Sequence, residues 1–366
     1  MTKLLHISDT HLGYRQYHNE IRREDFSKSF DQGIDIAIDK NVDAVIHTGD
    51  LFHSKNPNLK TQIEAVQIVK KLEENNIPFL AIVGNHERKR DQQFLDYMNM
   101  TLDNIVLLDK EPWSTDEVSV HGFDYIPSTQ WRNTNFELED TSSEVTIVCM
   151  HQLINPPVPE LFNPYDSENL VSKFKKDVDI IALGDYHQPE GHEIDGTYLY
   201  YPGSTEMTSK DEPKQKYVCL WEIEDGEYEE EYIPLNTRKF VDIYIDLKDK
   251  DNPIEKLKRN IDDVNEAVVH VTFTGVEIPF SKSSIKEILE GYGAIITRVI
   301  DKRSNISDLK PVNFEVKDIE SAINDNLSEE NLSGVAHKID DIVRDSEIKK
   351  SHVRSNVKRI LKEESP

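Results

Sequence analysis

Cysteine is almost absent from the sequence, which contains only Cys149 and Cys219. Two cysteines are too few for a disulfide framework, and we expect both to be core thiols in a reducing compartment. No stretch approaches the roughly 20 apolar residues that a membrane-spanning helix needs. Met1 is followed by the strand-like run TKLLHIS rather than by a signal segment. We therefore expect a cytoplasmic protein.

Positive charge is also scarce, because 43 Lys and Arg residues stand against 69 Asp and Glu residues, for a net charge of −26. A protein that coats nucleic acid by bulk electrostatics needs clustered Lys and Arg. The composition argues against that class, so any affinity for DNA must be local. With 366 residues, of which 37% are hydrophobic, the chain can bury one large core and form one or two smaller modules.

Short apolar runs alternate with helix-like patterns over the first part of the chain. This alternation is typical of strands that are joined by helical crossovers in an α/β sheet. Apolar residues recur at intervals of three and four in two segments, which predicts amphipathic helices at 24–39 and 59–74. Strands are expected at 4–8, 43–48, 79–83, 145–150 and 180–183.

The pattern changes after residue 198 and again after residue 236. The run KYVCLWEIEDGEYEEEYIPL alternates like a hairpin, with Asp225 and Gly226 at a tight turn, and should form the closing edge of the core. The runs FVDIYIDL, AVVHVTFTG and AIITRVI then alternate with two helical stretches, which is enough for a small α/β domain. We divide the chain into a core at 1–236, a small domain at 237–307 and a tail at 308–366.

The tail is mostly polar, and few of its residues could build a core. Amphipathic stretches at 316–326 and 333–345 precede the basic run KKSHVRSNVKRILK. The tail can be interpreted as a solvated segment or as a helical segment that orders on a partner.

Side chains that can bind metal ions follow five of the expected strands, in the segments SDTH, GD, GNHE, MH and GDYH. The carboxyl ends of adjacent strands in an open α/β sheet form the crevice where ligands bind, so these distant segments can meet there. A lone Asp or His at a strand end is more often a cap or a loop residue. Five such clusters in this order favour a metal site. The possible ligands are Asp9, His11, Asp50, Asn85, His151, Asp185 and His187.

The residue types in these clusters suit two divalent cations. Asp and Asn supply hard oxygens and His supplies nitrogen, while the absence of thiolates disfavours a structural zinc site. Manganese is the natural occupant. A dinuclear centre needs one ligand that bridges metals roughly 3.5–4 Å apart. Asp50 is our candidate for that bridge.

The motifs D-x-H, G-D, G-N-H-E, H and G-D-Y-H closely resemble those of the calcineurin-like metallophosphoesterase family. Within it, SDTHLG, GDLFH and YPGSTE are similar to the SbcD-type nucleases, known in eukaryotes as the meiotic recombination eleven nuclease. The sequence looks most like an archaeal member of this group. The resemblance covers roughly residues 1–236 and extends more loosely to the small domain. It implies an α/β sandwich of two mixed sheets flanked by helices, with a small α/β cap and a helical C-terminal tail.

The resemblance also implies two Mn²⁺ ions in each subunit. One ion would be held by Asp9, His11, Asp50 and His187. The other would be held by Asp50, Asn85, His151 and Asp185. The usual last motif of the family is G-H-x-H, so Asp185 stands where a histidine is expected. A carboxylate can bind manganese and should favour a hard ion, but this departure leaves the affinity for the second metal open.

Further roles follow from the same resemblance. His86 would stabilise the transition state or protonate the leaving group, and His53 would contact the scissile phosphate. The alternative for His53 is an ordinary surface histidine. The loop HLGYRQYH and the run ERKR place basic and aromatic residues beside the ligands, so His18 and Arg90 could contact DNA, although a charge run is usually only a solvated face.

The activity implied by the resemblance is the processing of DNA double-strand breaks, by a 3′-to-5′ exonuclease on duplex DNA and an endonuclease on single strands. A homodimer is implied, formed through helices at 59–74 and 91–101, as is a partner: a coiled-coil ABC-type ATPase of the SbcC kind. Two of these ATPases with two nuclease chains would make a heterotetrameric complex, with the small domain over the DNA and the tail on the partner.

Two other functions remain open. The first is a metallophosphatase or a cyclic-nucleotide phosphodiesterase of the same fold. The protein-phosphatase branch normally carries Asp-Arg-Gly after the second motif, whereas LFHSKN offers no arginine to bind a phosphomonoester dianion. The second is a scaffold that has kept the fold without the activity, which the nearly complete set of ligand types disfavours.

Overall fold

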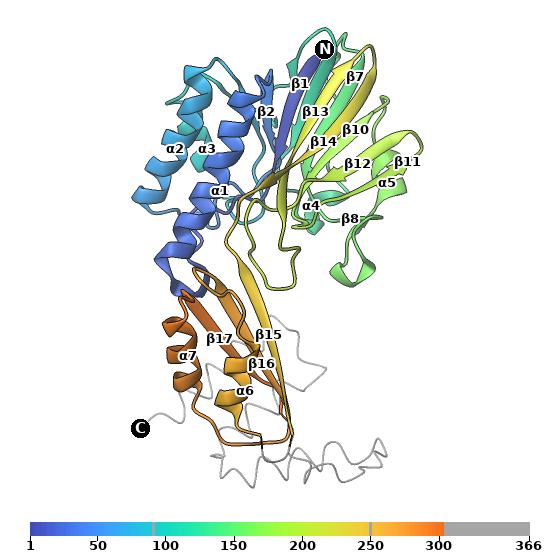
Figure 1. Cartoon of the computed structure of the whole chain (residues 1–366). Helices are drawn as coiled ribbons and strands as arrows, with labels where there is room; N and C mark the ends of the chain where they lie inside the picture. Colours follow the sequence, from blue (N-terminus) through green and yellow to red (C-terminus); the bar gives the residue numbers. More distant parts are fainter. Residues whose placement is uncertain (90–91, 249–250, 304–366) are drawn as a thin grey trace, which may run out of the picture. The chain divides into compact units, whose positions relative to one another are not determined.

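Two six-stranded mixed sheets form the centre of the protein (Figure 1). The computed structural model describes residues 1–89, 92–248 and 251–303. The strand order of the first sheet is β14-β13-β1-β2-β3-β4, in which β1 to β4 are parallel and the other two strands run antiparallel to their neighbours. Its strands are β1 (Thr2–Ile7), β2 (Ala44–His47), β3 (Phe79–Ala81), β4 (Ile105–Leu107), β13 (Lys216–Glu224) and β14 (Glu227–Leu235).

The second sheet has the order β11-β12-β10-β7-β6-β5, and β6, β7, β10 and β12 are parallel. Its strands are β5 (Trp113–Ser114), β6 (Val118–Phe123), β7 (Val145–His151), β10 (Ile180–Gly184), β11 (Glu190–Ile194) and β12 (Thr197–Tyr201). Leu4 and Ile46 of the first sheet pack with Ile147 and Ala182 of the second in one buried cluster. The expected α/β sandwich of two mixed sheets is therefore confirmed.

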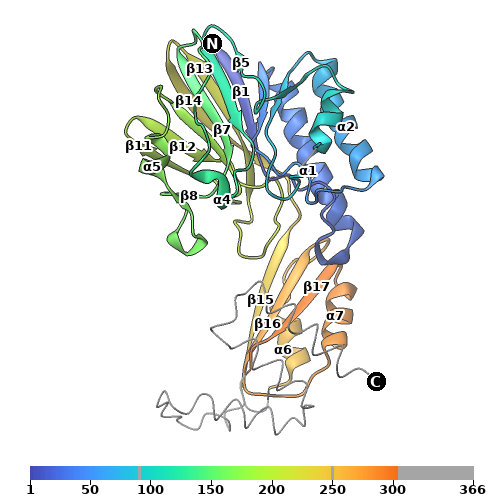
Figure 2. The same cartoon turned by 180° about the vertical axis from the view of Figure 1, so that it is seen from behind.

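Helices cover the other face of the first sheet (Figures 1 and 2). They are α1 (Glu20–Asp39), α2 (Leu59–Glu74) and α3 (Phe94–Asn99). Because side chains alternate across a strand, Leu5 and Ile7 of β1 face these helices and pack against Phe30 and Val69, while Leu4 faces the second sheet. The apolar periodicity of α2 predicted its bounds correctly.

Two helix predictions were less accurate. We expected the first helix at 24–39, but α1 begins at Glu20, where the side chain of Asn19 accepts a hydrogen bond from Ile21 N. Its first turn contains Arg22 and Arg23, which are buried and form ion pairs with Glu206 and Glu64. The charged residues at 20–23 therefore belong to the helix rather than to a loop before it. The helix expected at 91–101 is shorter, since α3 ends at Asn99.

Smaller elements cover the outer face of the second sheet. Its buried cluster joins Met150, Leu183 and Tyr201 to Trp131 and Leu170 from these elements. They are α4 (Ser128–Trp131), β8 (Ile154–Asn155), the 3-10 helix η2 (Glu160–Phe162), β9 (Tyr165–Asp166) and α5 (Ser167–Val171). A further 3-10 helix, η1 (Gln16–His18), follows β1.

The predicted hairpin is confirmed by the register of β13 and β14, in which Glu224 pairs with Glu227. Asp225 and Gly226 both have positive φ, at 52° and 80°, as the tightest hairpin turns require. Cys149 and Cys219 are both buried and free, as expected. No helix among the described residues is long and apolar enough to cross a membrane.

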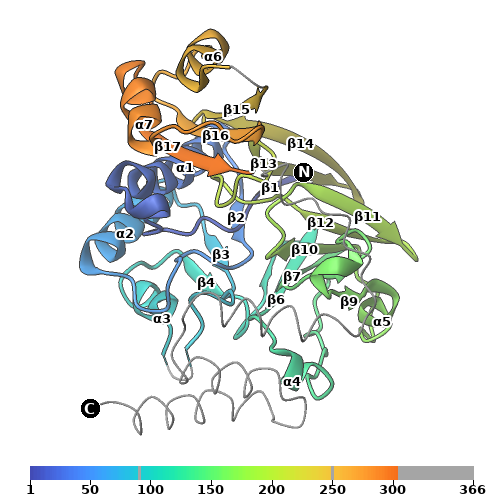
Figure 3. The ribbon, with the colours of Figure 1, turned by 90° about the horizontal axis from the view of Figure 1, so that it is seen from below.

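A separate three-stranded sheet follows, with the order β15-β16-β17 (Figure 3). Apolar residues of α6 and α7, including Leu257, Ile285 and Leu289, join Val269 and Val271 of the central strand in its core. The bounds are β15 (Phe240–Leu247), α6 (Pro253–Asn260), β16 (Val268–Gly275), α7 (Lys282–Gly291) and β17 (Ile296–Asp301). The tail expected at 308–366 lies outside the described residues.

Candidate metal centre

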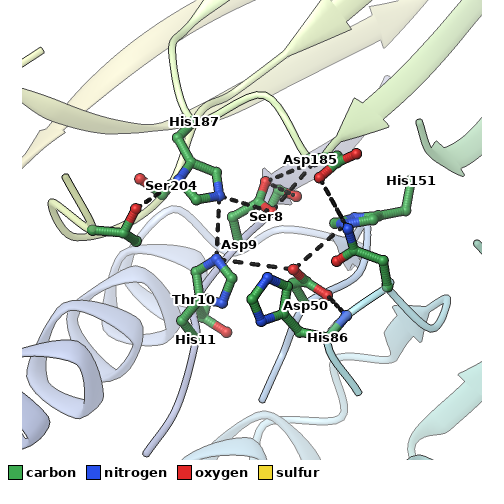
Figure 4. A network of polar contacts seen from close by, with 12 residues as sticks. Ser8, Asp9, Thr10, His11, Asp50, His86, His151, Asp185, His187 and Ser204 are labelled. Atoms are coloured by element: carbon green, nitrogen blue, oxygen red, sulfur yellow. Dashed lines mark hydrogen bonds and ion pairs between the residues drawn. The ribbon is translucent and has the colours of Figure 1, made fainter. Parts of the chain in front are cut away.

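The possible ligands meet at the carboxyl ends of five strands, three from the first sheet and two from the second (Figure 4). Asp9 and His11 follow β1, Asp50 follows β2 and Asn85 follows β3. From the second sheet, His151 ends β7, and Asp185 and His187 follow β10. The structure thus brings together all seven side chains that the sequence analysis selected.

The first set of ligand-type side chains consists of Asp9, His11, Asp50 and His187. The Nε2 atoms of His11 and His187 lie 3.2 Å apart. His187 Nε2 lies 3.6 Å from Asp9 Oδ1, and His11 Nε2 lies 3.9 Å from Asp50 Oδ2. These spacings allow Asp9, His11 and His187 to share one ion.

The second set consists of Asp50, Asn85, His151 and Asp185. His151 Nε2 lies 3.5 Å from Asp50 Oδ2 and 3.8 Å from Asp185 Oδ1. The amide of Asn85 donates to Asp185 Oδ1 at 3.3 Å. Asp9, Asp50 and His151 could also share an ion. Asp50 therefore lies between the two sets, as a bridging carboxylate must.

The backbone is strained at four of these positions. Asp9, His11, Asp50 and Asp185 have positive φ angles of 52°, 46°, 54° and 84°, a region that few side chains adopt. Such conformations are costly and gather at functional sites, where the surrounding structure enforces them. The strain is consistent with a site that is built for ligand placement rather than for stability.

Glycines next to the ligands allow the loops to approach closely. A Cβ atom on Gly84 would lie 2.1 Å from Asp50 Oδ1, and one on Gly184 would lie 2.3 Å from the carbonyl oxygen of Thr48. The glycines in GNHE and GDYH are therefore required for the two sheets to place their ligands at one point.

The electrostatics of the centre fit cations. In the described part of the chain, the ion-pair partners of Asp9, Asp50 and Asp185 are all histidines. The Nδ1 atom of His151 bonds to the carbonyl oxygen of Thr48 at 2.8 Å, which leaves its buried Nε2 without a hydrogen bond and facing the carboxylates. A buried group of carboxylates and imidazole nitrogens of this kind suits divalent metal ions.

Burial and charge act in opposite directions on the titration of these groups. Burial alone would raise the pKa of Asp50, but the neighbouring histidines, His151 foremost, together outweigh burial and the pKa is lowered. Burial would lower the pKa of His151, but Asp50 raises it well above its usual value. For Asp9 burial prevails and the pKa of the carboxyl is raised. The fold thus holds carboxylates close together at a cost that bound cations would remove.

Comparison with known proteins agrees with this geometry. The model of the calcineurin-like phosphoesterase family matches residues 2–189. The DNA double-strand break repair protein Mre11 of Haloferax volcanii is 32% identical over 362 residues, which cover 98% of this chain and 81% of that protein. Mre11 of Halobacterium salinarum is 33% identical over 98% of this chain and 93% of its own length. The chain belongs to the Mre11 family.

A more distant Mre11, from Sulfolobus acidocaldarius, is 29% identical and covers 95% of this chain and 96% of that protein. Membership of the Mre11 family makes the chain a metal-dependent phosphoesterase, a hydrolase. Its Asp and His residues form a dimetal site of the type that calcineurin-like phosphoesterases have.

The two histidines expected to act in catalysis lie beside the first set. His86 N donates to Asp50 Oδ1 at 2.9 Å, and His86 Nδ1 bonds to the carbonyl oxygen of His53 at 3.1 Å. The His53 ring stacks on Tyr14 with the ring centres 3.9 Å apart, and burial lowers its pKa to about 4. His11, His53 and His86 are also close enough to share a metal ion themselves.

Of the two residues expected to contact DNA, the structure describes only one. His18 is exposed at the end of η1, outside the groups of side chains that could hold metal. Arg90 lies outside the described residues. Whether either residue touches DNA stays a prediction.

Two glutamates at the centre were not singled out by the sequence analysis. Glu87 is buried and accepts hydrogen bonds from the backbone N–H groups of Gly84, Leu51 and Phe52, so it joins two ligand loops. Burial, together with Asp50, raises its pKa to about 8. Its place in GNHE was a usable signal. Glu212, which bonds to His187 Nδ1 at 3.0 Å, stands in a polar loop and gave no such signal.

Proposed function

We propose that this protein is a manganese-dependent DNA nuclease that processes double-strand breaks. It would act as a 3′-to-5′ exonuclease on duplex DNA and as an endonuclease on single strands, through two-metal hydrolysis of phosphodiester bonds. The observation that carries the proposal is the convergence of seven ligand-type side chains from two sheets on one centre, with Asp50 between the sets. The names of its Mre11 relatives support DNA breaks as the substrate.

The proposal assigns one Mn²⁺ ion to the first set and one to the second. Carboxylate and amide oxygens dominate the second set, and such hard ligands favour Mn²⁺ over softer ions. When bound, the pair of ions would neutralise phosphodiester charge and lower the pKa of a water molecule. The chain's own contribution is to hold the ligands in place, through strained loops and the backbone hydrogen bonds to Glu87.

His86 is proposed to give a proton to the leaving oxygen. Its Nδ1–H is directed to the carbonyl oxygen of His53, so the proton given to the leaving oxygen would be the one that Nε2 carries in the imidazolium form of the ring. The exposed position of His86 allows DNA to reach it. His53, held by its stack on Tyr14, is proposed to contact the phosphate that is cut.

The small domain at 237–307 is proposed to cap the DNA over this centre. Tyr17, which lies in the loop after His11, bonds through its hydroxyl to His270 Nε2 of β16 at 3.0 Å. The Arg298 guanidinium lies 5.5 Å from the centre of the same tyrosine ring. These contacts link the proposed DNA-binding loop to the small domain and support the assignment.

The proposed partners are DNA ends, a second copy of this chain and a coiled-coil ABC-type ATPase that binds the tail. For the homodimer, the support is a set of exposed apolar side chains on and beside α2 and α3. Leu95 and Met98 of α3 are buried in the core, and Val66 and Phe94 pack partly against it. The exposed residues are Leu59, Ile63, Tyr97 and Met100.

A substrate comparison tests the proposal. Duplex DNA with recessed and blunt ends, single-stranded circles, a cyclic nucleotide and p-nitrophenyl phosphate are incubated with the protein and Mn²⁺, and with EDTA as the control. We expect cleavage of the DNA substrates only with metal. Strong hydrolysis of the phosphomonoester or the cyclic nucleotide with intact DNA would instead support a phosphatase or a cyclic-nucleotide phosphodiesterase.

A further inference from the structure

The loop between β12 and β13 is organised around one carboxylate, that of Glu212. Its side chain is only 8% exposed and accepts hydrogen bonds from the backbone N–H groups of Thr208 and Ser209 and from the hydroxyls of Ser204 and Thr208. It also accepts one from Lys216 Nζ at 2.6 Å. A carboxylate with this many donors is held in a single position.

This fixed carboxylate faces His187. Glu212 Oε1 lies 3.0 Å from His187 Nδ1, and the Lys216 ammonium group, 1% exposed, donates to the carbonyl oxygen of His187 at 3.1 Å. The Glu212–Lys216 ion pair therefore holds His187 at both its ring and its backbone. Apart from the Thr208 hydroxyl, Glu212 is the group that bonds to Nδ1.

The contacts decide which ring nitrogen carries the proton. The hydroxyl of Thr208 lies 2.9 Å from Nδ1, but it donates its own proton to Glu212, so both neighbours of Nδ1 act as acceptors. Nδ1 must then be protonated, which leaves a lone pair on Nε2 in the neutral ring. That Nε2 atom is the one that lies 3.2 Å from His11 Nε2 and 3.6 Å from Asp9.

We propose that Glu212 is a positioning residue, which fixes His187 as the Nδ1–H tautomer and directs its Nε2 lone pair to the metal of the first set. A carboxylate partner also makes the imidazole a stronger donor to a metal. His151 of the second set bonds instead to a neutral backbone carbonyl, that of Thr48. The inference rests on the proposed metal assignment and predicts that Glu212 governs one of the two ions.

The test measures Mn²⁺ binding by electron paramagnetic resonance, because free and bound ions give different signals. Loss of a partner of this kind costs about 10–100-fold in metal affinity. We expect Glu212→Gln to weaken one of the two binding steps by that factor and to leave the other within twofold of the original. The matched control is Asp211→Asn, which makes the same charge change at the adjacent, exposed position and should leave both steps unchanged.

Glu212→Gln leaves Lys216 buried without its charge partner, which could unfold the loop. The double variant Glu212→Leu/Lys216→Met removes both charges and should fold, as circular dichroism can check. It should show the same selective weakening. If this variant is folded and both its binding constants lie within twofold of those of the original protein, the inference is wrong.

A spectroscopic reading separates positioning from general support of the loop. In protein with ¹⁵N-labelled histidine and Cd²⁺ in place of Mn²⁺, the Nδ1 proton of His187 is identified by its loss in His187→Asn. It should shift upfield in Glu212→Gln, and an unchanged shift would overturn the inference. If the original protein binds no Mn²⁺, the proposed metal centre itself fails, before any Glu212 variant is measured.

Discussion

The two metal sets of the centre are held in different ways. In the first set, the side chain of His11 is 2% exposed, and His187 is fixed by the charged groups of Glu212 and Lys216. In the second set, Asn85 is exposed, Asp185 supplies a second carboxylate, and His151 is oriented by a backbone carbonyl. From this difference we predict that the first set retains its metal ion more firmly than the second set does.

The largest expected effect comes from Asp50, which serves both sets. Asp50→Asn removes the carboxylate that lies near a histidine of each set, His11 and His151, so we expect both Mn²⁺ ions to be lost. Because metal ions contribute several kcal/mol to such reactions, cleavage should fall by roughly 10⁴-fold. Equilibrium dialysis with Mn²⁺ and a DNA cleavage assay check this. Retention of one tightly bound ion would show that the two sets are independent.

His86 comes next, because it should affect chemistry without affecting metal retention in either set. His86→Ser should slow cleavage by roughly 10³-fold, within the usual range for a general acid. Mn²⁺ stoichiometry and DNA binding in EDTA should remain as in the original protein. Cleavage at the original rate would exclude the proposed role, and loss of one Mn²⁺ ion would instead place a metal among His11, His53 and His86.

Asp185 is the residue that makes the second set acidic. Asp185→His replaces a hard oxygen ligand by a nitrogen and brings the second set closer to the first in its donors. We expect the ratio of Zn²⁺ to Mn²⁺ affinity at the weaker binding step to rise by about tenfold. Competition titration of the two metals measures that ratio. An unchanged ratio would mean that Asp185 does not touch the metal.

The smallest expected effect is a change in the pH dependence of stability, and it concerns Asp124, which bonds to the backbone just before Asn85 of the second set. Its Oδ1 accepts a hydrogen bond from Val83 N at 2.8 Å, two residues before Asn85. Burial, with the nearby Asp109 carboxylate, raises the pKa of Asp124 to about 7. The folded protein therefore binds this proton more tightly than the unfolded chain. The resulting stabilisation is complete below about pH 4 and is lost as the pH rises through about 7.

Asp124→Asn keeps the acceptor oxygen but cannot titrate. Between pH 5 and pH 8, the free energy of unfolding of the original protein should fall by about 1 kcal/mol more than that of the variant, since Asp124 is partly exposed. Urea unfolding in EDTA at the two pH values gives both numbers. If the free energy of unfolding changes equally in the two proteins, Asp124 does not titrate with a raised pKa.

The sequence predicted which ligand-type side chains would meet at this centre because each follows a short apolar strand, and three of the seven come directly after a glycine. Asp50 and Asp185, for example, come directly after Gly49 and Gly184. The apolar periodicity of α2 was equally clear. These signals are local, so they can be interpreted without knowledge of what packs against them.

What the sequence did not reveal depends on contacts between distant residues. The first turn of α1 contains Arg22, whose buried guanidinium pairs with Asp25 of the same helix and with the distant Glu206. Glu212 stands among other charged residues in SKDEPKQK, and only its contact with His187 gives it a role. His11, His53 and His86 also form a third possible metal group that spacing along the chain does not suggest.

Anomalous X-ray diffraction near the manganese edge, from crystals grown with Mn²⁺, tests the central claim most directly. We predict two peaks per chain, roughly 3.5–4 Å apart, with Asp50 touching both. One peak should lie against His11 and His187, and the other against Asn85 and Asp185. The absence of peaks at this centre, or a single peak held by His11, His53 and His86, would contradict the account.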